Sequence, residues 1–282
     1  MSIGDSSLKG RNIVVTGANT GIGRITAETL AKRGAKVTLA CRSEEKTRPV
    51  LDAIAAAGGT AEFLELDLGD LASVRAAAQS LLDRGEPLHV LINNAGVASA
   101  RGKTKDGFEL AFGTNHLGHF LFTTLLLPRL RESAPARIVN VASKAHYRAA
   151  GVPFDRLREP TKSRTGWPEY ASSKLCNVLF TKELARGRAG DGVKSYAVHP
   201  GVIASDLWRS LPSIVGPVIK LFMKSNEEGA RSSIYCATSP EVAEHDGRYY
   251  DEDCREKRGS SLANDAALAE ELWEKSEAWT KE

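Results

Sequence analysis

The chain has 282 residues, with 42% hydrophobic and 26% charged side chains, an ordinary globular composition that excludes a disordered or collagen-like protein. Its formal net charge of +3, from 38 basic and 35 acidic residues, is too balanced for a nucleic-acid-binding surface. No stretch reaches the roughly 20 apolar residues that a membrane span requires. Four cysteines without a Cys-x-x-Cys pair indicate free thiols in a reducing compartment, and the polar start predicts no signal peptide. We therefore expect a cytoplasmic protein with no membrane span.

Short apolar strands alternate with helices along the chain. The expected strands are 12–16, 36–40, 61–66, 88–92, 137–141, 193–198 and 247–250. The expected helices are 21–33, 44–57, 71–82, 113–130, 170–188, 226–237 and 262–279. This alternation predicts an α/β fold, a doubly wound parallel sheet of about seven strands with helices on both faces. Because no linker divides the chain, we expect a single domain over 1–282.

A glycine-rich turn joins the first strand to the first helix. It reads Thr16-Gly17-Ala18-Asn19-Thr20-Gly21-Ile22-Gly23. Such a turn lets the backbone approach a pyrophosphate, and the helix N-terminus adds N–H groups and a positive dipole end. The alternative is a tight turn that serves close packing of helix on sheet. The sequence predicts a dinucleotide site here, with these candidate residues: Gly17, Asn19, Thr20, Gly21, Ile22 and Gly23.

The end of the second strand distinguishes NAD from NADP. A carboxylate there would hold the adenosine ribose hydroxyls and repel a 2′-phosphate. This chain has Cys41 and then Arg42, whose guanidinium offers a fork of donors suited to phosphate. We therefore expect NADP(H) in preference to NAD(H), the alternative being that Arg42 is an ordinary surface arginine. Arg24, in the first helix, could assist or could be solvated.

Tyr170 and Lys174 stand four positions apart in a predicted helix, so they share one helix face. A phenol has an ordinary pKa of about 10 and is a weak acid–base group at neutral pH. A nearby ammonium stabilises the phenolate and lowers that pKa. The pair therefore predicts an acid–base site, although the same spacing is common in amphipathic surface helices.

Seven short motifs are spread along the chain. They are Thr16-Gly17-x-x-x-Gly21-Ile22-Gly23, Asp67-Leu68, Asn93-Asn94-Ala95-Gly96, Asn115, Ser143, Tyr170-x-x-x-Lys174 and Pro200-Gly201. Their order and spacing resemble the short-chain dehydrogenase/reductase family over nearly the whole chain, which implies a Rossmann-type sheet. Three further segments make the chain most similar to the retinol dehydrogenase-like branch. They are Ala40-Cys41-Arg42, Thr114-Asn115-His116-Leu117-Gly118-His119-Phe120 and Leu179-Phe180-Thr181-Lys182-Glu183-Leu184-Ala185.

The resemblance implies roles for four catalytic candidates. Tyr170 would be the acid–base that gives its proton to a carbonyl oxygen. Lys174 would depress the pKa of Tyr170 and hold the nicotinamide ribose. Ser143 would hydrogen-bond the substrate oxygen. Asn115 would kink its helix and hold a water that links Lys174 to solvent. This is general acid–base catalysis combined with hydride transfer.

The resemblance also implies further cofactor contacts beyond the glycine-rich turn. Asp67 and Leu68 would lie at the adenine edge, and the backbone around Asn94, Ala95 and Gly96 would flank the adenosine ribose. The nicotinamide would be walled by Pro200, Gly201 and Ile203, and by Ser205, which stands where the family usually has a threonine. Tyr170 and Lys174 would contact the cofactor as well.

Four histidines and one apolar segment need separate interpretation. His116 and His119 stand at a spacing that could ligate zinc, but no third ligand is visible nearby and we expect no metal. His146 and His199 are interpreted as pocket-lining or hydrogen-bonded core residues. The apolar stretch 207–223 predicts a substrate lid at about 205–224, the alternatives being a core helix or a membrane-surface patch.

The resemblance implies an oxidoreductase of class EC 1.1.1 that transfers a hydride between NADP(H) and a carbonyl or alcohol. The small-molecule substrate is expected to be apolar, either retinal-like or another aldehyde or ketone. Two alternatives stay open, a nucleotide-sugar epimerase or dehydratase and a non-catalytic NADP-sensing scaffold. Family members often pair through helices corresponding to 113–130 and 170–188, which implies a homodimer or homotetramer.

Overall fold

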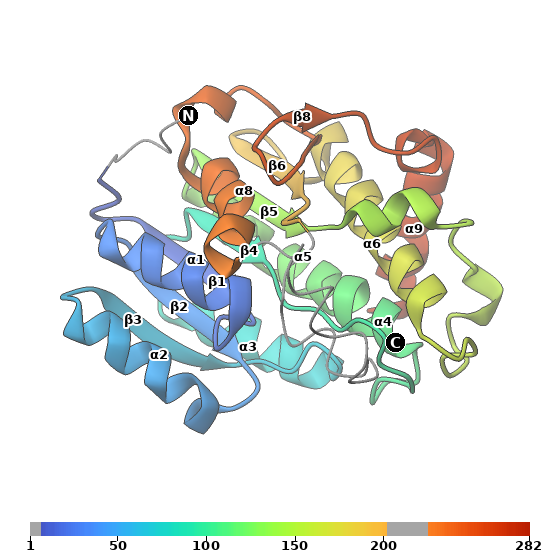
Figure 1. The fold of residues 1–282 in the computed structure, drawn as a ribbon, viewed down its shortest axis with the longest axis horizontal. Helices are drawn as coiled ribbons and strands as arrows, with labels where there is room; N and C mark the ends of the chain where they lie inside the picture. Colours follow the sequence, from blue (N-terminus) through green and yellow to red (C-terminus); the bar gives the residue numbers. More distant parts are fainter. Residues whose placement is uncertain (1–6, 202–224) are drawn as a thin grey trace.

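One sheet of eight strands runs through the protein in the order β3-β2-β1-β4-β5-β6-β7-β8 (Figure 1). The computed structural model describes residues 7–201 and 225–282. The expected lid at 205–224, with its apolar part at 207–223, lies outside the described residues. The cofactor candidates Ile203 and Ser205 lie outside them too.

Seven of the eight strands are parallel, as the sequence predicts. The strands are β1 (Asn12–Thr16), β2 (Lys36–Cys41), β3 (Thr60–Glu65), β4 (Val90–Asn93), β5 (Ala136–Val141), β6 (Val193–Val198), β7 (Arg248–Tyr250) and β8 (Glu256–Lys257). The eighth strand is antiparallel to β7 and was not predicted. It has only two residues, both charged and exposed, so no apolar pattern marks it in the sequence.

The strand order reverses between β1 and β4. Val14 of β1 pairs with Thr38 of β2 on one side and with Leu91 of β4 on the other. The chain therefore runs outward from β1 to β3 and returns to the opposite side of β1. In parallel sheets the crevice beyond the carboxyl ends of the strands at this reversal is the usual ligand site. Residues that follow β1, β4 and β5 are thus placed around one crevice.

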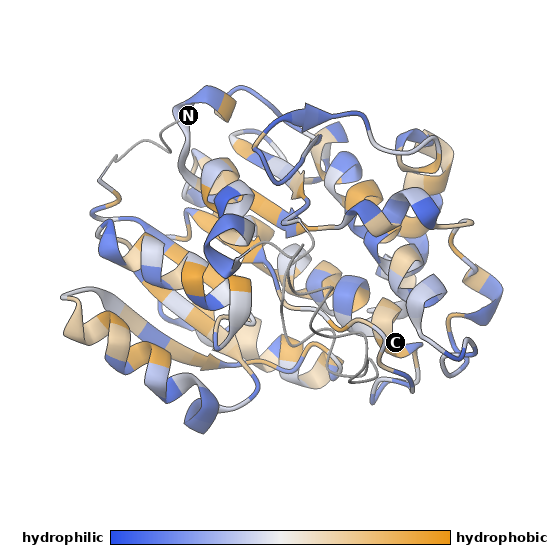
Figure 2. Cartoon of the chain, in the orientation of Figure 1, coloured by the Kyte–Doolittle hydropathy of each residue, from blue (hydrophilic) through white to orange (hydrophobic). Residues whose placement is uncertain are grey.

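Helices cover both faces of the sheet, which confirms the predicted fold class. One face carries α1 (Gly21–Lys32), α2 (Glu44–Ala56) and α8 (Asn226–Thr238). The other carries α3 (Leu71–Asp83), α5 (Gly118–Glu132) and α6 (Trp167–Glu183). Apolar strand residues lie between these helix layers (Figure 2).

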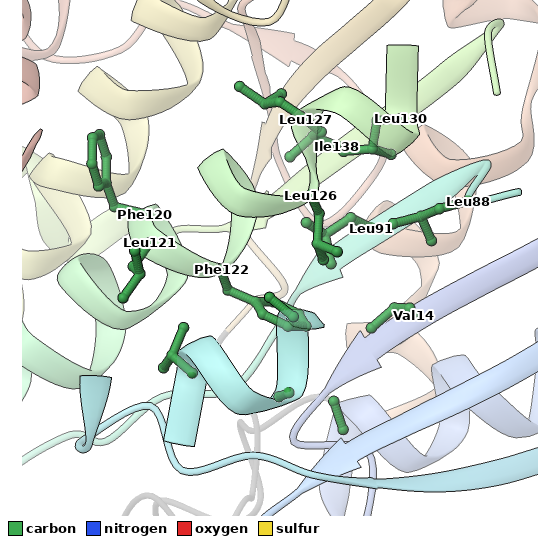
Figure 3. Close-up of a cluster of buried hydrophobic side chains, with 14 of the residues drawn as sticks. Val14, Leu88, Leu91, Phe120, Leu121, Phe122, Leu126, Leu127, Leu130 and Ile138 are labelled. Carbon is green, nitrogen blue, oxygen red and sulfur yellow. The ribbon is translucent and has the colours of Figure 1, made fainter. Parts of the chain in front are cut away.

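Alternation along β1 explains why two cores form. Ile13 and Val15 pack with α1 and α2 on one face, whereas Val14 packs on the opposite face. Successive strand residues point to opposite faces, and parallel strands buried on both sides are apolar at nearly every position. Figure 3 shows Phe122 and Leu126 of α5 in the same cluster as Val14.

The helix predicted at 113–130 is three elements in the structure. A short α4 (Leu110–Phe112) leads into a π-helical turn, η1 (Gly113–Leu117), and then into α5. π-turns inside α-helices are rare and often occur at functional sites. Here the turn contains Asn115, where the resemblance implied a kink.

The helix predicted at 170–188 begins earlier than expected. α6 starts at Trp167, after Gly166 in the left-handed region with φ of +66°, and Pro168 lies in its first turn. Glycine adopts this backbone readily, and proline is well tolerated at a helix start. Tyr170 therefore lies inside the first turn of α6 rather than at its first residue. A π-helical turn, η4 (Leu184–Arg188), ends the helix.

The C-terminal segment packs against the helices that family members often use for pairing. After a short 3-10 turn, η7 (Leu262–Asn264), the helix expected at 262–279 runs as α9 (Ala266–Trp279). The ring of Trp273 lies 4.9 Å from that of Phe120 on α5 and 5.8 Å from that of Phe180 on α6. A dimer that used this face of α5 and α6 would have to displace α9.

Further short 3-10 turns link the remaining elements: η2 (Lys144–Arg148), η3 (Phe154–Arg156) and η6 (Pro240–Val242). None of the helices formed by residues 7–201 and 225–282 is both long enough and apolar enough to cross a membrane.

Candidate active site

Tyr170 and Lys174 lie one turn apart on α6, at the carboxyl end of β5. The Lys174 side chain is buried, with only 4% of the residue exposed. Its Nζ donates a 2.8 Å hydrogen bond to the carbonyl oxygen of Val141, the last residue of β5. Nζ also lies 5.7 Å from the centre of the Tyr170 ring. The helix and the strand end therefore fix the ammonium beside the phenol.

Ser143 approaches the same phenol from the loop after β5. It is the N-cap of η2, where its Oγ accepts a 3.1 Å hydrogen bond from the backbone N–H of Ala145. The Ser143 side chain lies close enough to Tyr170 to favour the phenolate form of its ring. The structure thus brings together the three side chains predicted to handle the substrate oxygen and its proton.

Burial sets the protonation of this pair. It raises the pKa of Tyr170, while the nearby Ser143 side chain opposes the rise. Burial also lowers the pKa of Lys174 to about 8. The pKa of Tyr170 is thus raised, and not lowered as expected, because desolvation disfavours the phenolate more than its neighbours favour it. Tyr170 is consequently a neutral phenol around pH 7, the form that can donate a proton.

Asn115 anchors the π-turn to the loop after β4. Its Oδ1 accepts a 2.8 Å hydrogen bond from the N–H of Val97, and its Nδ2 donates to the Val97 carbonyl oxygen at 3.0 Å. The same Nδ2 donates to Ser173 Oγ at 2.9 Å. This side chain is therefore fully engaged in positioning. Only its backbone carbonyl, which accepts from His119 Nδ1 at 3.0 Å, faces other partners.

The glycine-rich turn has the shape that a dinucleotide requires. Gly17 has φ of +65°, and a Cβ there would lie 2.9 Å from Ala95. At Gly23 a Cβ would lie 2.3 Å from the Gly17 carbonyl oxygen, so helix and turn approach too closely for any side chain. At Gly21, by contrast, the one atom of the described residues that a Cβ would meet is Asn226 Oδ1, at 3.8 Å. The space beside Gly21 is thus open to a ligand.

The start of α1 is also suited to an anion. No acidic residue lies in its first turn. N–H groups of the first turn and the positive dipole end then face the open space beside Gly21. The predicted residues Asn19 and Ile22 flank this point along the chain. The turn therefore fits a pyrophosphate.

The loop after β4 joins this turn to the catalytic lysine. Asn94 Nδ2 donates to the carbonyl oxygen of Thr16 at 2.8 Å, so its side chain is committed to the turn. The N–H groups of Asn94 and Ala95 both donate to Thr16 Oγ1, at 2.9 and 3.0 Å. At Gly96 a Cβ would lie 3.5 Å from Lys174 Nζ. Backbone atoms of this loop are thus the groups it can offer to a ribose.

Arg42 stands where the second strand meets the glycine-rich turn. The N–H of Gly17 donates to the carbonyl oxygen of Ala40 at 2.8 Å, which places the end of β2 beside the turn. Arg42 follows β2 directly and is exposed. Within residues 7–201 and 225–282 its guanidinium has no hydrogen bond or ion pair, whereas Arg24 is paired with Glu28 at 2.7 Å. Arg42 is therefore the better placed of the two for a 2′-phosphate.

The remaining predicted cofactor residues follow β3 and β6. Asp67 Oδ1 accepts a 2.9 Å hydrogen bond from the N–H of Gly69, which orders the turn after β3. Leu68 is buried at 4% exposure. Pro200 and Gly201 follow β6, and Gly201 has φ of +90°. These four residues all lie just beyond the carboxyl ends of their strands, at the crevice edge of the sheet.

The four histidines singled out in the sequence are all buried. His116 Nε2 lies 3.0 Å from Ser276 Oγ of α9, and His119 Nε2 lies 2.8 Å from Thr16 Oγ1. His146 Nδ1 lies 2.7 Å from the Ser143 carbonyl oxygen, and His199 Nδ1 accepts from the Lys144 N–H at 3.3 Å. In the part of the chain that the structure describes, no group of three His, Cys, Asp or Glu side chains could hold a metal ion.

Asn226 is a candidate cofactor-binding residue that the sequence analysis did not predict. It is the first residue of α8, and its Oδ1 is buried without a hydrogen-bond partner. This atom is the nearest neighbour of the open space beside Gly21. An unpartnered amide oxygen at that place could accept a hydrogen bond from a hydroxyl of a ligand. No motif or spacing marks this residue, because the contact joins segments about 200 positions apart.

A cavity of about 630 Å³ opens beside the first turns of α6. Pro168, Glu169 and Ser172 line it from α6, and Glu109, Phe112 and residues of the 148–163 segment line the rest. Ser143, Tyr170 and Lys174 are not among its lining residues. The cavity is therefore separate from the catalytic side chains within the described residues.

Comparison with known proteins agrees with this arrangement. Residues 11–154 match the family described as short chain dehydrogenase. Human retinol dehydrogenase 12 is 45% identical over 271 residues, covering 94% of this chain and 85% of that protein. An uncharacterised protein from Mycobacterium paratuberculosis has a solved structure with a TM-score of 0.78 and 36% identity, covering 98% of this chain and 95% of that one.

A further solved structure was determined with a cofactor. It is a putative NAD(P)-dependent gluconate 5-dehydrogenase from Beutenbergia cavernae with bound NADP. Its TM-score is 0.69 at 26% identity, covering 88% of this chain and 97% of that one. The chain therefore belongs to the short-chain dehydrogenase family, as an oxidoreductase of the retinol dehydrogenase-like branch, and the predicted resemblance is confirmed.

Proposed function

We propose that the protein transfers a hydride between NADP(H) and an apolar carbonyl or alcohol, with Tyr170 as the acid–base. The observation that carries this proposal is the buried, neutral phenol of Tyr170, with the Ser143 side chain near it and the Lys174 Nζ 5.7 Å from the centre of its ring. The site lies at the carboxyl edge of a sheet whose glycine-rich turn fits a pyrophosphate. Retinol dehydrogenase 12, at 45% identity, supports the reaction class.

Ser143, Tyr170 and Lys174 have different roles in the reduction. Bound NADPH supplies the hydride that adds to the carbonyl carbon. The hydroxyls of Ser143 and Tyr170 would together hold the carbonyl oxygen. As negative charge develops on that oxygen, Tyr170 gives up its phenolic proton to it and becomes a phenolate. The Lys174 ammonium beside the ring stabilises that phenolate.

Lys174 has a second task toward the cofactor. Its Nζ now donates to the Val141 carbonyl oxygen, which also accepts from Asn177 Nδ2 at 3.1 Å. An ammonium has three donors, so two remain for the nicotinamide ribose hydroxyls. Gly96 lies beside Nζ and leaves room for that sugar. We propose that Pro200 and Gly201 lie along the nicotinamide.

NADP is favoured over NAD by the environment of Arg42. The guanidinium is exposed, follows the strand that adjoins the glycine-rich turn, and is paired with no described carboxylate. A bidentate guanidinium contact suits a phosphate. The gluconate 5-dehydrogenase with bound NADP supports the same choice.

Substitution of Arg42 by alanine should weaken NADPH binding by about 1.5 to 3 kcal/mol, the scale of a charge-assisted hydrogen bond. Binding of NADH should be almost unchanged, because it lacks the 2′-phosphate. Fluorescence titration of both cofactors measures the two dissociation constants. Arg24→Ala is the matched control, since Arg24 is occupied by Glu28. Equal losses of affinity for NADPH and NADH would show that Arg42 does not read the phosphate.

The substrate class is tested with a series of straight-chain aldehydes and with retinal. If an apolar surface receives the chain, kcat/KM should rise by about fourfold per buried CH₂, the equivalent of about 0.8 kcal/mol. NADPH absorbance follows the rate. A flat series, or a clear preference for short polar carbonyls, would contradict an apolar substrate while leaving the reaction class intact.

The cellular setting is a further part of the proposal. All four cysteines are free thiols, and three of them are buried, which is consistent with a reducing compartment such as the cytoplasm. Self-association into a homodimer or homotetramer would use a surface other than the face of α5 and α6 that α9 covers.

A further inference from the structure

His119 is a buried side chain that joins two parts of the site. It lies on α5, one turn after Asn115, and only 2% of it is exposed. Its Nε2 lies 2.8 Å from Thr16 Oγ1, at the end of β1 where the glycine-rich turn begins. Its Nδ1 lies 3.0 Å from the carbonyl oxygen of Asn115 in the π-turn. Thr16 and His119 are 103 positions apart in the chain, so only the fold brings them together.

The partners of His119 determine which ring nitrogen carries the proton. A carbonyl oxygen can only accept, so Nδ1 must be the N–H that donates to Asn115. Burial lowers the pKa of His119 to about 4, so the ring is neutral at pH 7 and Nε2 must accept. Thr16 Oγ1 then donates to Nε2. This assignment is consistent with the other bonds of Thr16, whose oxygen already accepts two N–H groups, from Asn94 and Ala95.

We propose that His119, held as the neutral Nδ1–H tautomer, is a positioning residue that locks the Asn115 π-turn to the end of β1 and so sets the place of Lys174. The proposal rests on the proposed function for its kinetic part. The chain of contacts runs from Thr16 through the imidazole to the Asn115 backbone. Asn115 in turn holds Val97 and Ser173, and Ser173 precedes Lys174 on α6.

Loss of the imidazole should disturb the Asn115 end of this chain of contacts and leave the Thr16 end in place. Without His119, Thr16 still accepts from Asn94 and Ala95, and its hydroxyl can turn toward the Ile92 carbonyl oxygen, now 3.5 Å away. The cofactor turn should therefore hold. The carbonyl of Asn115 would lose its donor, and the π-turn would be free to shift. We expect a loss in kcat with little change in cofactor affinity.

The first measurement needs no substrate. Nitrogen-15 labelling of the six histidines and long-range proton–nitrogen correlation distinguish the two neutral tautomers and the imidazolium. His119→Asn assigns the signal by its disappearance. At neutral pH we expect a protonated Nδ1 and an unprotonated Nε2 for His119. A proton on Nε2, or on both nitrogens, would overturn the proposal whatever the activity of the enzyme.

The second measurement compares three variants at position 119 with purified protein. His119→Phe removes both hydrogen bonds and should lower kcat about 10- to 100-fold, the scale for a displaced catalytic group. His119→Asn places an amide N–H where Nδ1 stood and should recover most of kcat. His119→Gln places its amide where Nε2 stood and should not. In all three variants the NADPH dissociation constant should stay within about twofold of the wild-type value, because the cofactor turn is not displaced.

His116→Phe is the matched control. His116 is equally buried, three residues earlier, but bonds Ser276 of α9 and lies among aromatic rings. This variant should lose stability without losing kcat. If His119→Phe also keeps kcat, or if Asn and Gln at position 119 behave alike, His119 is only a packing residue. A wild-type protein that reduces no carbonyl would contradict the proposed function instead, and the tautomer measurement would still decide this inference.

Discussion

Substitution of Tyr170 by phenylalanine should lower kcat at least 100-fold, within the usual worth of general acid–base catalysis. The variant removes one hydroxyl and keeps the ring, which packs 5.4 Å from Trp167 between centroids. The other side chains of the site are unaltered, so the affinity for NADPH should stay nearly unchanged. Steady-state rates with saturating NADPH and aldehyde, together with fluorescence titration of NADPH, measure the two quantities.

Tyr235→Phe provides the control for Tyr170→Phe. Tyr235 lies on α8, where its hydroxyl donates to Glu241 Oε2 at 2.8 Å. Its loss should leave kcat unchanged, because Tyr235 contacts no group of the site. If Tyr170→Phe turns over like the wild type, the proton comes from another donor and the assigned mechanism is wrong.

Substitution of Lys174 by methionine should abolish turnover and yet stabilise the protein. Burial lowers the Lys174 pKa from 10.5 to about 8, so folding at pH 7 carries the cost of a desolvated ammonium. A difference of this size corresponds to about 3 to 4 kcal/mol. The Val141 carbonyl oxygen would keep its bond from Asn177, so no buried acceptor is left unpaired. We expect Tm to rise by several degrees, as measured by calorimetry.

The pH dependence of unfolding gives the sign of this effect. Between about pH 8 and 10.5 the unfolded chain holds the Lys174 proton while the folded protein has released it. Wild-type stability should therefore gain with rising pH in this window relative to Lys174→Met. Lys182→Met, on the same helix, is the control and should retain activity. A Lys174→Met variant that is less stable than wild type at pH 7 would mean that the ammonium is well solvated or well paired.

Much of the architecture was predictable because it depends on local sequence patterns. Parallel strands buried on both faces are apolar runs, as in Asn12–Thr16, and the helices between them follow period 3.6. The glycine-rich turn was predictable because sterics allow few residues there. Gly17 has a positive φ, and Gly23 lies against the Gly17 carbonyl. The catalytic set was predicted from motif resemblance, and the structure places Ser143, Tyr170 and Lys174 together.

The features that escaped the sequence depend on contacts between distant segments. The resemblance implied a kink at Asn115 but not its π-helical form, which is held by Val97 and Ser173, neither of which belongs to its helix. The unpartnered Oδ1 of Asn226 lies near Gly21 because α8 packs on α1. The raised pKa of Tyr170 follows from burial, which a spacing of four residues does not reveal.

The most direct test of hydride transfer between NADP(H) and a carbonyl uses NADPH that carries deuterium at nicotinamide C4. The wild-type protein is incubated with this cofactor and with retinal or a long-chain aldehyde, and the alcohol is analysed by mass spectrometry. The mechanism predicts one deuterium on the carbinol carbon, with stoichiometric loss of NADPH absorbance. Tight NADPH binding with no oxidation across the aldehydes would instead indicate a cofactor-sensing protein. Conversion of a nucleotide sugar without net cofactor oxidation would indicate an epimerase, and either result would contradict the proposed function.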